Sequence, residues 1–151
     1  QTVYVPIGLG SGISAMIAAR AALGLQTEIV GVVSSHARAY AESFRRKMPV
    51  DSPVTTRLAD GIACRSPNPE ALDVILKGVD RVVEVSDMEV AEAIRTIFEC
   101  THNVSEGAGA AGTAAAMQER SRNAGRKIAV VITGGNIDRE LFADVLNMTF
   151  T

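Results

Sequence analysis

The stretch YVPIGLGSGISA, residues 4–15, decides the fold. Its first residues have the composition of a buried β-strand, and its last residues begin a segment of helical composition. Three glycines at alternate positions, Gly8, Gly10 and Gly12, join the two. Glycines there let backbone N–H groups turn inward together, and the positive end of the following helix adds to their effect. Such a loop is typical of phosphate binding at the end of a strand.

Strands and helices alternate along the whole chain. Short apolar runs predict buried strands at residues 2–7, 28–33, 81–85 and 127–132. Helices are predicted at residues 12–24, 36–47, 86–100, 106–117 and 137–147, with a short one that Asn68 caps and Pro69 begins. This alternation favours parallel strands with right-handed crossovers. The sequence therefore predicts a single α/β domain over residues 1–151, with a doubly wound parallel sheet between two layers of helices.

Local signals support several of these helices. Gly24 has the position of a C′ glycine after the first helix. Ser86 and Glu89 form a capping-box pair before the helix at 86–100. The run at 106–117, EGAGAAGTAAAM, has small side chains that allow close approach to a neighbouring layer.

The composition excludes several classes of partner. Apolar residues make up 47% of the 151 residues and aromatic residues 4%, which suits an α/β domain with short buried strands. The net charge of −2 without a basic cluster argues against nucleic acid, and no apolar run is long enough for a membrane span. Cys64 and Cys100 lie far apart, which favours a reduced cytoplasmic protein with both thiols buried or half-buried.

Two familiar phosphate-binding motifs fit the first loop poorly. In the dinucleotide motif the third glycine would fall on Ile13, and the next strand would end in an acidic residue where this chain has Val33. The P-loop motif fails because no Gly-Lys-Ser/Thr follows the glycines. An NAD(P)-binding oxidoreductase domain, a non-catalytic phosphate-binding module and a glycine turn without a ligand remain as alternatives.

A second glycine loop favours a ligand. Thr133, Gly134, Gly135 and Asn136 follow the fourth predicted strand directly. In open parallel sheets, ligands bind beyond the carboxyl ends of the strands, where both loops would lie. One loop would present amides and the other a hydroxyl, which suggests a small phosphorylated ligand with a polar ring atom. The second loop would otherwise only end the strand and cap a helix.

Four ordered segments resemble one enzyme family. VPIGLGSGIS, TTRLADGIA, THNVSEGAGAAG and VVITGGNID occur here in the order found in serine/threonine dehydratases (threonine ammonia-lyases). These are pyridoxal-phosphate (PLP) enzymes of fold type II, the tryptophan synthase β-like fold, whose relatives include serine racemase. The resemblance spans nearly the whole chain and implies the larger part of a fold type II cofactor domain, with PLP as cofactor.

The resemblance also implies roles for individual residues. The backbone amides of Gly8, Leu9, Gly10, Ser11 and Gly12 would hold the PLP phosphate. Leu9 and Ser11 replace glycines of the commoner version, which is tolerable where φ stays negative. Thr133, followed by Gly134, would bond the pyridine nitrogen. The expected reaction is dehydration and deamination of a β-hydroxy amino acid, a small-molecule amino-acid substrate, giving 2-oxobutanoate and ammonia from L-threonine or pyruvate from L-serine.

This chain departs from the family pattern in two ways. The Schiff-base lysine of the family lies upstream of the glycine loop, and Lys47, Lys77 and Lys127 have the contexts of surface charges. We therefore expect residues 1–151 to be the C-terminal portion of the catalytic region, without a catalytic residue and inactive alone. Some relatives bind a divalent metal where this chain has Val33 and Ala39, so we expect no metal there.

Other residues have weaker expectations. Asp60 and Gly61 would lie near the open face of the cofactor. Glu106 would either lie near the ring or act only as a charge at a helix N-terminus. Asn136 would stabilise its loop. His36 and His102 lack partners at a recognisable spacing and receive no role. Family relatives are commonly dimers or tetramers, so a homo-oligomer is expected.

Overall fold

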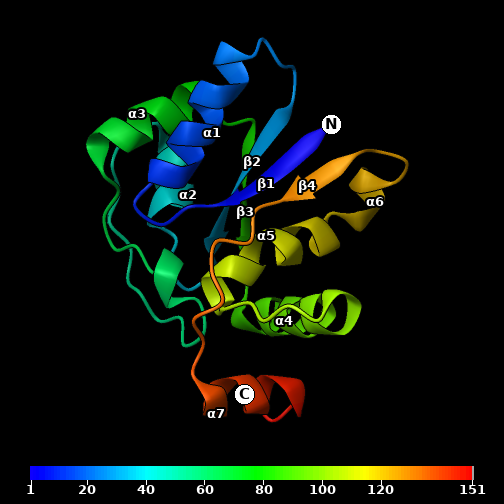
Figure 1. The fold of residues 1–151 in the computed structure, drawn as a ribbon. Coiled ribbons are helices and arrows are strands. Elements are labelled where there is room, and N and C mark those ends of the chain that lie inside the picture. Colours follow the sequence, from blue (N-terminus) through cyan, green and yellow to red (C-terminus); the bar gives the residue numbers. More distant parts are fainter. Residues whose placement is uncertain (151) are drawn as a thin grey trace.

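One parallel sheet forms the centre of the computed structural model, which describes residues 1–150 (Figure 1). Its strands are β1 (Thr2–Pro6), β2 (Glu28–Ser34), β3 (Arg81–Val85) and β4 (Ile128–Val130), in the order β3-β2-β1-β4. Every pairing is parallel. The chain runs from β1 outward to β3 and then returns to the other side of β1. The carboxyl ends of β1 and β4 therefore form the point where the strand order reverses, the usual ligand position in such sheets.

Helices cover both faces of the sheet (Figure 1). One face carries α1 (Ser11–Ala22), α2 (Ala39–Arg46) and α3 (Pro69–Gly78). The other face carries α4 (Asp87–Thr101) and α5 (Gly107–Gln118). The remaining elements are a 3-10 turn η1 (Asp60–Ile62), a short α6 (Arg120–Asn123) and α7 (Arg139–Leu146). The predicted three-layer α/β fold is confirmed.

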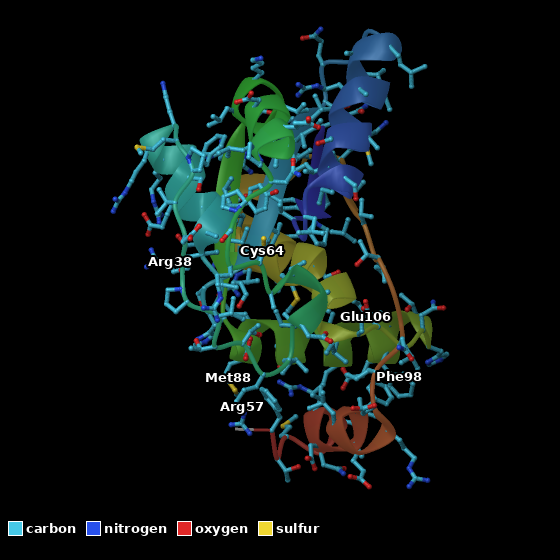
Figure 2. All side chains as sticks on the ribbon, turned by 90° about the vertical axis from the view of Figure 1, so that its left-hand side faces the viewer. Arg38, Arg57, Cys64, Met88, Phe98 and Glu106 are labelled. Atoms are coloured by element: carbon cyan, nitrogen blue, oxygen red, sulfur yellow. The ribbon has the colours of Figure 1, made fainter. Side chains whose placement is uncertain are left out.

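The outermost helix, α7, packs on α4. The rings of Phe98 and Phe142 meet edge to face, with their centroids 5.5 Å apart. Figure 2 labels Phe98, which points from α4 toward the C-terminal helix.

Two apolar clusters hold the layers together. Tyr4, Val30 and Val32 face the layer of α4 and α5. The alternate residues Val3 and Ile29 face α1, α2 and α3. Because both faces of each strand are covered, the central strands appear in the sequence as continuous apolar runs.

Small residues bring α5 close to its neighbours. A Cβ on Gly112 would lie 3.3 Å from the carbonyl oxygen of Tyr4 in β1. A Cβ on Gly107 would overlap the Leu58 carbonyl oxygen. The predicted close approach of the Ala/Gly-rich segment is therefore confirmed, and it draws the residues before η1 onto the start of α5.

The predicted helix ends are confirmed where a local signal marked them. Gly24 has φ +61° and donates its N–H to the Ala21 carbonyl. Asn68 caps α3 by accepting the Ala71 N–H at 2.9 Å. Both hydrogen bonds of the capping box between Ser86 and Glu89 are present.

Several element boundaries differ from the prediction, including that of α7, which begins at Arg139 where 137 was expected. The helix expected at 36–47 begins only at Ala39, because Ala37 donates its N–H to the Ser34 carbonyl and forms a turn. The fourth strand, expected at 127–132, spans only Ile128–Val130. The N–H of Val131 still donates to the Tyr4 carbonyl before the chain leaves the sheet. Within residues 1–150, no helix is both long and apolar enough to cross a membrane.

Candidate cofactor site

The two glycine loops leave the sheet from neighbouring strands at the same end (Figure 1). The loop of Gly8–Gly12 follows β1, and the segment Thr133–Asn136 begins three residues after β4. The hydrogen bond from Val131 to Tyr4, at 3.1 Å, joins the two strands just before they separate. Both loops therefore lie at the reversal of the strand order.

The first loop offers backbone N–H groups as hydrogen-bond donors to a ligand. Within the part of the chain that the structure describes, the N–H groups of Gly8–Gly12 donate to no other protein group. Gly10 has φ +99°, in the left-handed region, whereas Leu9 and Ser11 stay outside it, as the sequence required. Among residues 1–150, no side chain caps α1, and the first turn of this helix carries no acidic residue. The positive end of α1 and these free donors together favour an anion.

The segment around η1 closes on the first loop. A Cβ on Gly8 would lie 2.8 Å from the Gly61 carbonyl oxygen. On its other side, a Cβ on Gly61 would lie 2.8 Å from Cβ of Ala108 in α5. Three of the four segments that resemble the dehydratases therefore meet at this point.

Glu106 joins the fourth segment to the others. Its backbone N–H donates to the Gly134 carbonyl at 3.1 Å, and its Oε2 accepts the N–H of Asn136 at 3.1 Å. Its Oε1 lies 3.8 Å from the position of a Cβ on Gly61. Figure 2 shows Glu106 at the start of α5, between η1 and the segment that leads to α7. Glu106 occupies the N-cap position of α5, but its carboxylate bonds the loop after β4 instead of capping that helix.

The remaining predicted residues differ in what they offer. Thr133 is exposed, and no hydrogen bond of its hydroxyl is found within residues 1–150. Asp60 is also exposed, and its Oδ1 accepts the N–H of Gly61 at 2.9 Å within the same turn. Asn136 donates its backbone N–H to Oε2 of Glu106, and its expected stabilising role stays a prediction.

Two buried residues that support the site were missed from the sequence. The hydroxyl of Tyr40 donates to the Leu9 carbonyl at 2.8 Å. The carboxylate of Asp87 accepts the Thr56 hydroxyl at 2.6 Å and the Arg57 N–H at 2.7 Å, which anchors the segment before η1. In the sequence, Tyr40 has the position of an ordinary packing residue of a helix. Asp87 has the position of an ordinary acidic residue in the first turn of a helix. The sequence offered only a general indication for Tyr40, because a buried tyrosine hydroxyl usually has a hydrogen-bond partner.

The structure also describes the lysines and the two apolar residues that were expected to have no role in the site. Lys47, Lys77 and Lys127 are exposed. Val33 is buried in β2, and Ala39 is buried at the start of α2, so both offer only hydrocarbon.

The cysteines and histidines need one correction. Cys64 is buried as expected, and burial raises the pKa of its thiol. Cys100 is exposed near the end of α4, so the expectation of a buried or half-buried thiol was wrong there. His102 ends α4 with φ +58°, and its Nδ1 lies 3.3 Å from the Phe98 carbonyl.

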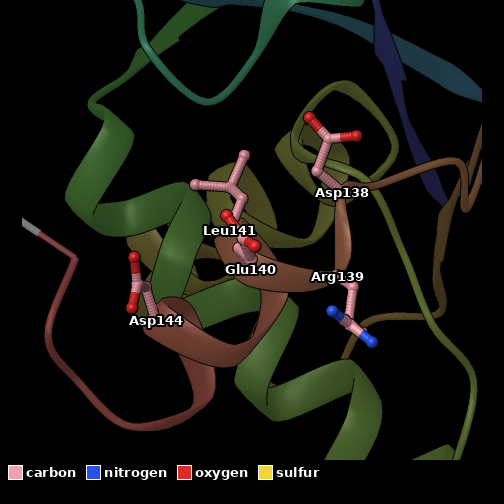
Figure 3. A pocket seen from close by; sticks show the side chains of 5 residues that line it. All are labelled: Asp138, Arg139, Glu140, Leu141 and Asp144. Atoms are coloured by element: carbon pink, nitrogen blue, oxygen red, sulfur yellow. The ribbon is translucent and has the colours of Figure 1, made fainter.

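A surface hollow over α7 is a poor alternative site. It has a volume of about 490 Å³ and is lined by Asp138, Arg139, Glu140, Leu141 and Asp144 (Figure 3). Three carboxylates against one guanidinium would repel a phosphate, and none of the predicted site residues lines it.

Known proteins share both the sequence and the fold. Residues 1–134 match the family described as pyridoxal-phosphate dependent enzyme. An L-threonine ammonia-lyase of Thermotoga maritima is 34% identical over 147 residues, which are 97% of this chain and 36% of that protein. An L-threonine ammonia-lyase of Geobacter sulfurreducens is 37% identical over 136 residues, 90% of this chain and 34% of that protein.

A solved structure agrees with these relatives. The threonine deaminase of T.th. superposes with a TM-score of 0.84 at 29% identity, covering 91% of this chain and 46% of that one. The chain spans about a third of the length of the two L-threonine ammonia-lyases, at 36% and 34%.

Proposed function

Since this chain belongs to the family of pyridoxal-phosphate-dependent enzymes, we propose that it forms the cofactor-binding part of a dehydratase that acts on a β-hydroxy amino acid. L-threonine, giving 2-oxobutanoate and ammonia, and L-serine, giving pyruvate, are the proposed substrates. The names of the T. maritima and G. sulfurreducens relatives support this reaction class. The observation that supports it most is the row of N–H groups at Gly8–Gly12 that donate to no described residue, at the same end of the sheet as the exposed hydroxyl of Thr133.

The first loop fits the phosphate of the cofactor. A phosphate offers several acceptor oxygens, and the N–H groups of Gly8–Gly12 are donors that no described residue uses. Gly10 has a left-handed backbone, and such a residue suits a turn in which successive N–H groups would point to one side. The absence of an acidic residue in the first turn of α1 leaves the positive helix end unopposed.

Thr133 suits the pyridine nitrogen of the cofactor. Bound PLP supplies an electron-withdrawing ring that stabilises negative charge at the substrate α-carbon. A carboxylate beside the ring nitrogen would keep that nitrogen protonated, whereas the neutral hydroxyl of Thr133 would only hydrogen-bond it. The weaker electron withdrawal that follows suits a β-elimination, because the β-hydroxyl leaves promptly.

The surrounding residues would hold this arrangement. Glu106 would fix the loop of Thr133 through Gly134 and Asn136, and Gly61 would close against Gly8. We include in the proposal a cytoplasmic protein that assembles as a dimer or tetramer. The Schiff-base lysine of the family is not identified in residues 1–151, so the isolated chain is proposed to be inactive.

Binding to the 151-residue chain tests the cofactor assignment. We would titrate the ¹⁵N-labelled chain separately with PLP and with NADH, and follow its backbone amide resonances. PLP is expected to shift the resonances of Gly8–Gly12, and Thr133→Ala is expected to weaken binding of the ring. Shifts caused by NADH without any caused by PLP would instead favour a nucleotide-binding domain.

Activity is tested on the complete gene product that contains this sequence. The expected outcome is release of 2-oxobutanoate from L-threonine or pyruvate from L-serine. Strong keto-acid production by residues 1–151 alone would contradict the proposed inactivity of the isolated chain.

A further inference from the structure

We propose that Tyr40 is a positioning residue that aims the backbone of the first glycine loop at the cofactor phosphate. The inference rests on the proposed function, because it assigns Tyr40 a part in the same phosphate site. Tyr40 lies in α2, outside both glycine loops, and only 1% of it is exposed.

The hydroxyl of Tyr40 joins three elements. It donates to the Leu9 carbonyl at 2.8 Å and accepts the N–H of Asn68 at 3.1 Å. A Cβ on Gly10 would lie 3.1 Å from the same hydroxyl oxygen and 2.6 Å from Cβ of Ala71. The loop therefore rests directly on Tyr40 and on the first turn of α3.

Peptide geometry links this contact to the phosphate site. In a planar trans peptide, the carbonyl of Leu9 and the N–H of Gly10 point in opposite directions. Holding the carbonyl against the buried hydroxyl therefore turns the N–H of Gly10 away from the protein interior. It also keeps a carbonyl oxygen, which would repel a phosphate, out of the row of donors.

The support behind Tyr40 is itself fixed. Asn68 accepts the Ala71 N–H at 2.9 Å as the cap of α3, while its own N–H donates to Tyr40. Burial raises the pKa of Tyr40, so the hydroxyl keeps its proton and remains a donor to Leu9 at neutral pH. The orientation of the loop backbone is thus fixed before any ligand binds. This lowers the entropic cost of ordering the loop on binding.

Tyr40→Phe removes the hydroxyl and keeps the ring. Tyr4→Phe is the matched control, because Tyr4 is 0% exposed and donates to Glu119 at 2.7 Å, away from the loops. Each 151-residue variant would be titrated by NMR with PLP and with pyridoxal, which lacks the phosphate. Tyr40→Phe is expected to weaken PLP binding about three- to tenfold and to leave pyridoxal binding unchanged. Tyr4→Phe is expected to change neither affinity.

Several outcomes would overturn the inference while leaving the proposed function intact. One is wild-type affinity for PLP in Tyr40→Phe. Another is an equal loss for PLP and pyridoxal, which would indicate a general loss of structure instead of a change at the phosphate loop. Failure of the wild-type chain to bind PLP would count against the proposed function.

A ligand-free measurement tests Tyr40 in that case as well. The N–H of Ser14 donates to the Gly10 carbonyl at 3.0 Å, so its hydrogen exchange reports on the loop. Tyr40→Phe is expected to speed this exchange at least about threefold. The control Tyr4→Phe is expected not to. Equal rates in Tyr40→Phe and the wild type would contradict the positioning role.

Discussion

The carboxylate of Glu106 lies directly against the backbone of Gly134, where a Cβ would be 2.6 Å from Oε1. The N–H of Glu106 also donates to the Gly134 carbonyl at 3.1 Å, and its Oε2 accepts the N–H of Asn136 at 3.1 Å. One residue at the start of α5 therefore holds the loop after β4 through both its backbone and its side chain. This contact couples the Ala/Gly-rich helix to the loop that presents Thr133.

Replacing Glu106 should loosen that loop. Glu106→Ala removes the acceptor of the Asn136 N–H and should lower the free energy of unfolding by about 1 kcal/mol. It should also weaken PLP binding about fivefold, measured by titration of the 151-residue chain. Glu106→Gln keeps an acceptor oxygen and should stay within about twofold of the wild-type affinity. Equal losses in the two variants would show that the charge matters and the hydrogen bond does not.

Two glycines at helix starts should respond in opposite ways to alanine. Gly107→Ala would place a Cβ onto the Leu58 carbonyl oxygen, a backbone atom, and should lower the free energy of unfolding by about 1–3 kcal/mol. Gly12 has no heavy atom within 4 Å of its Cβ position and lies outside the left-handed region. Gly12→Ala should therefore stabilise the chain by about 0.5–1 kcal/mol. Urea denaturation of both variants measures the contrast, and a stable Gly107→Ala would refute it.

The sequence was informative where structure depends on near neighbours. Residues only a few positions apart form three of the predicted features: the helix cap at Asn68, the capping box of Ser86 and Glu89, and the glycine loop after β1. The strands were predictable because covering both faces of a sheet requires continuous apolar runs. The position of both glycine loops at one end of the sheet followed from the parallel topology alone.

The supports of the site could not be predicted in the same way. Tyr40 contacts Leu9 across 31 positions, and Asp87 contacts Thr56 across 31 positions. No local pattern encodes such pairs, since each depends on how α2 and α4 pack against loops from elsewhere in the chain. The shortened β4 has the same origin, because the chain leaves the sheet after Val131 and leads toward α7.

Asp87 should be important for the segment that carries Gly61. Its buried carboxylate accepts the Thr56 hydroxyl at 2.6 Å and the Arg57 N–H at 2.7 Å. Asp87→Ala leaves both donors without this acceptor and should lower the free energy of unfolding by about 2–3 kcal/mol. Asp73→Ala, at an exposed position in α3, is the control and should change it by less than about 0.5 kcal/mol. Similar effects of the two substitutions on chemical denaturation would contradict the anchoring role.

Glu28 should make stability depend on pH at the opposite end of the sheet. Burial alone would raise its pKa, but the Thr2 hydroxyl at 2.9 Å and the charges of Arg81 and Arg126 lower the pKa from 4.5 to about 2. Because the pKa in the folded chain is depressed, the stabilisation is fully present above pH 4.5 and disappears as the pH falls through about 2. Glu28→Gln should therefore cost about 1–3 kcal/mol at pH 7 and progressively less at pH values below 4.5. Urea denaturation of both proteins across this range measures the difference, and a constant gap would show that Glu28 is not the titrating group.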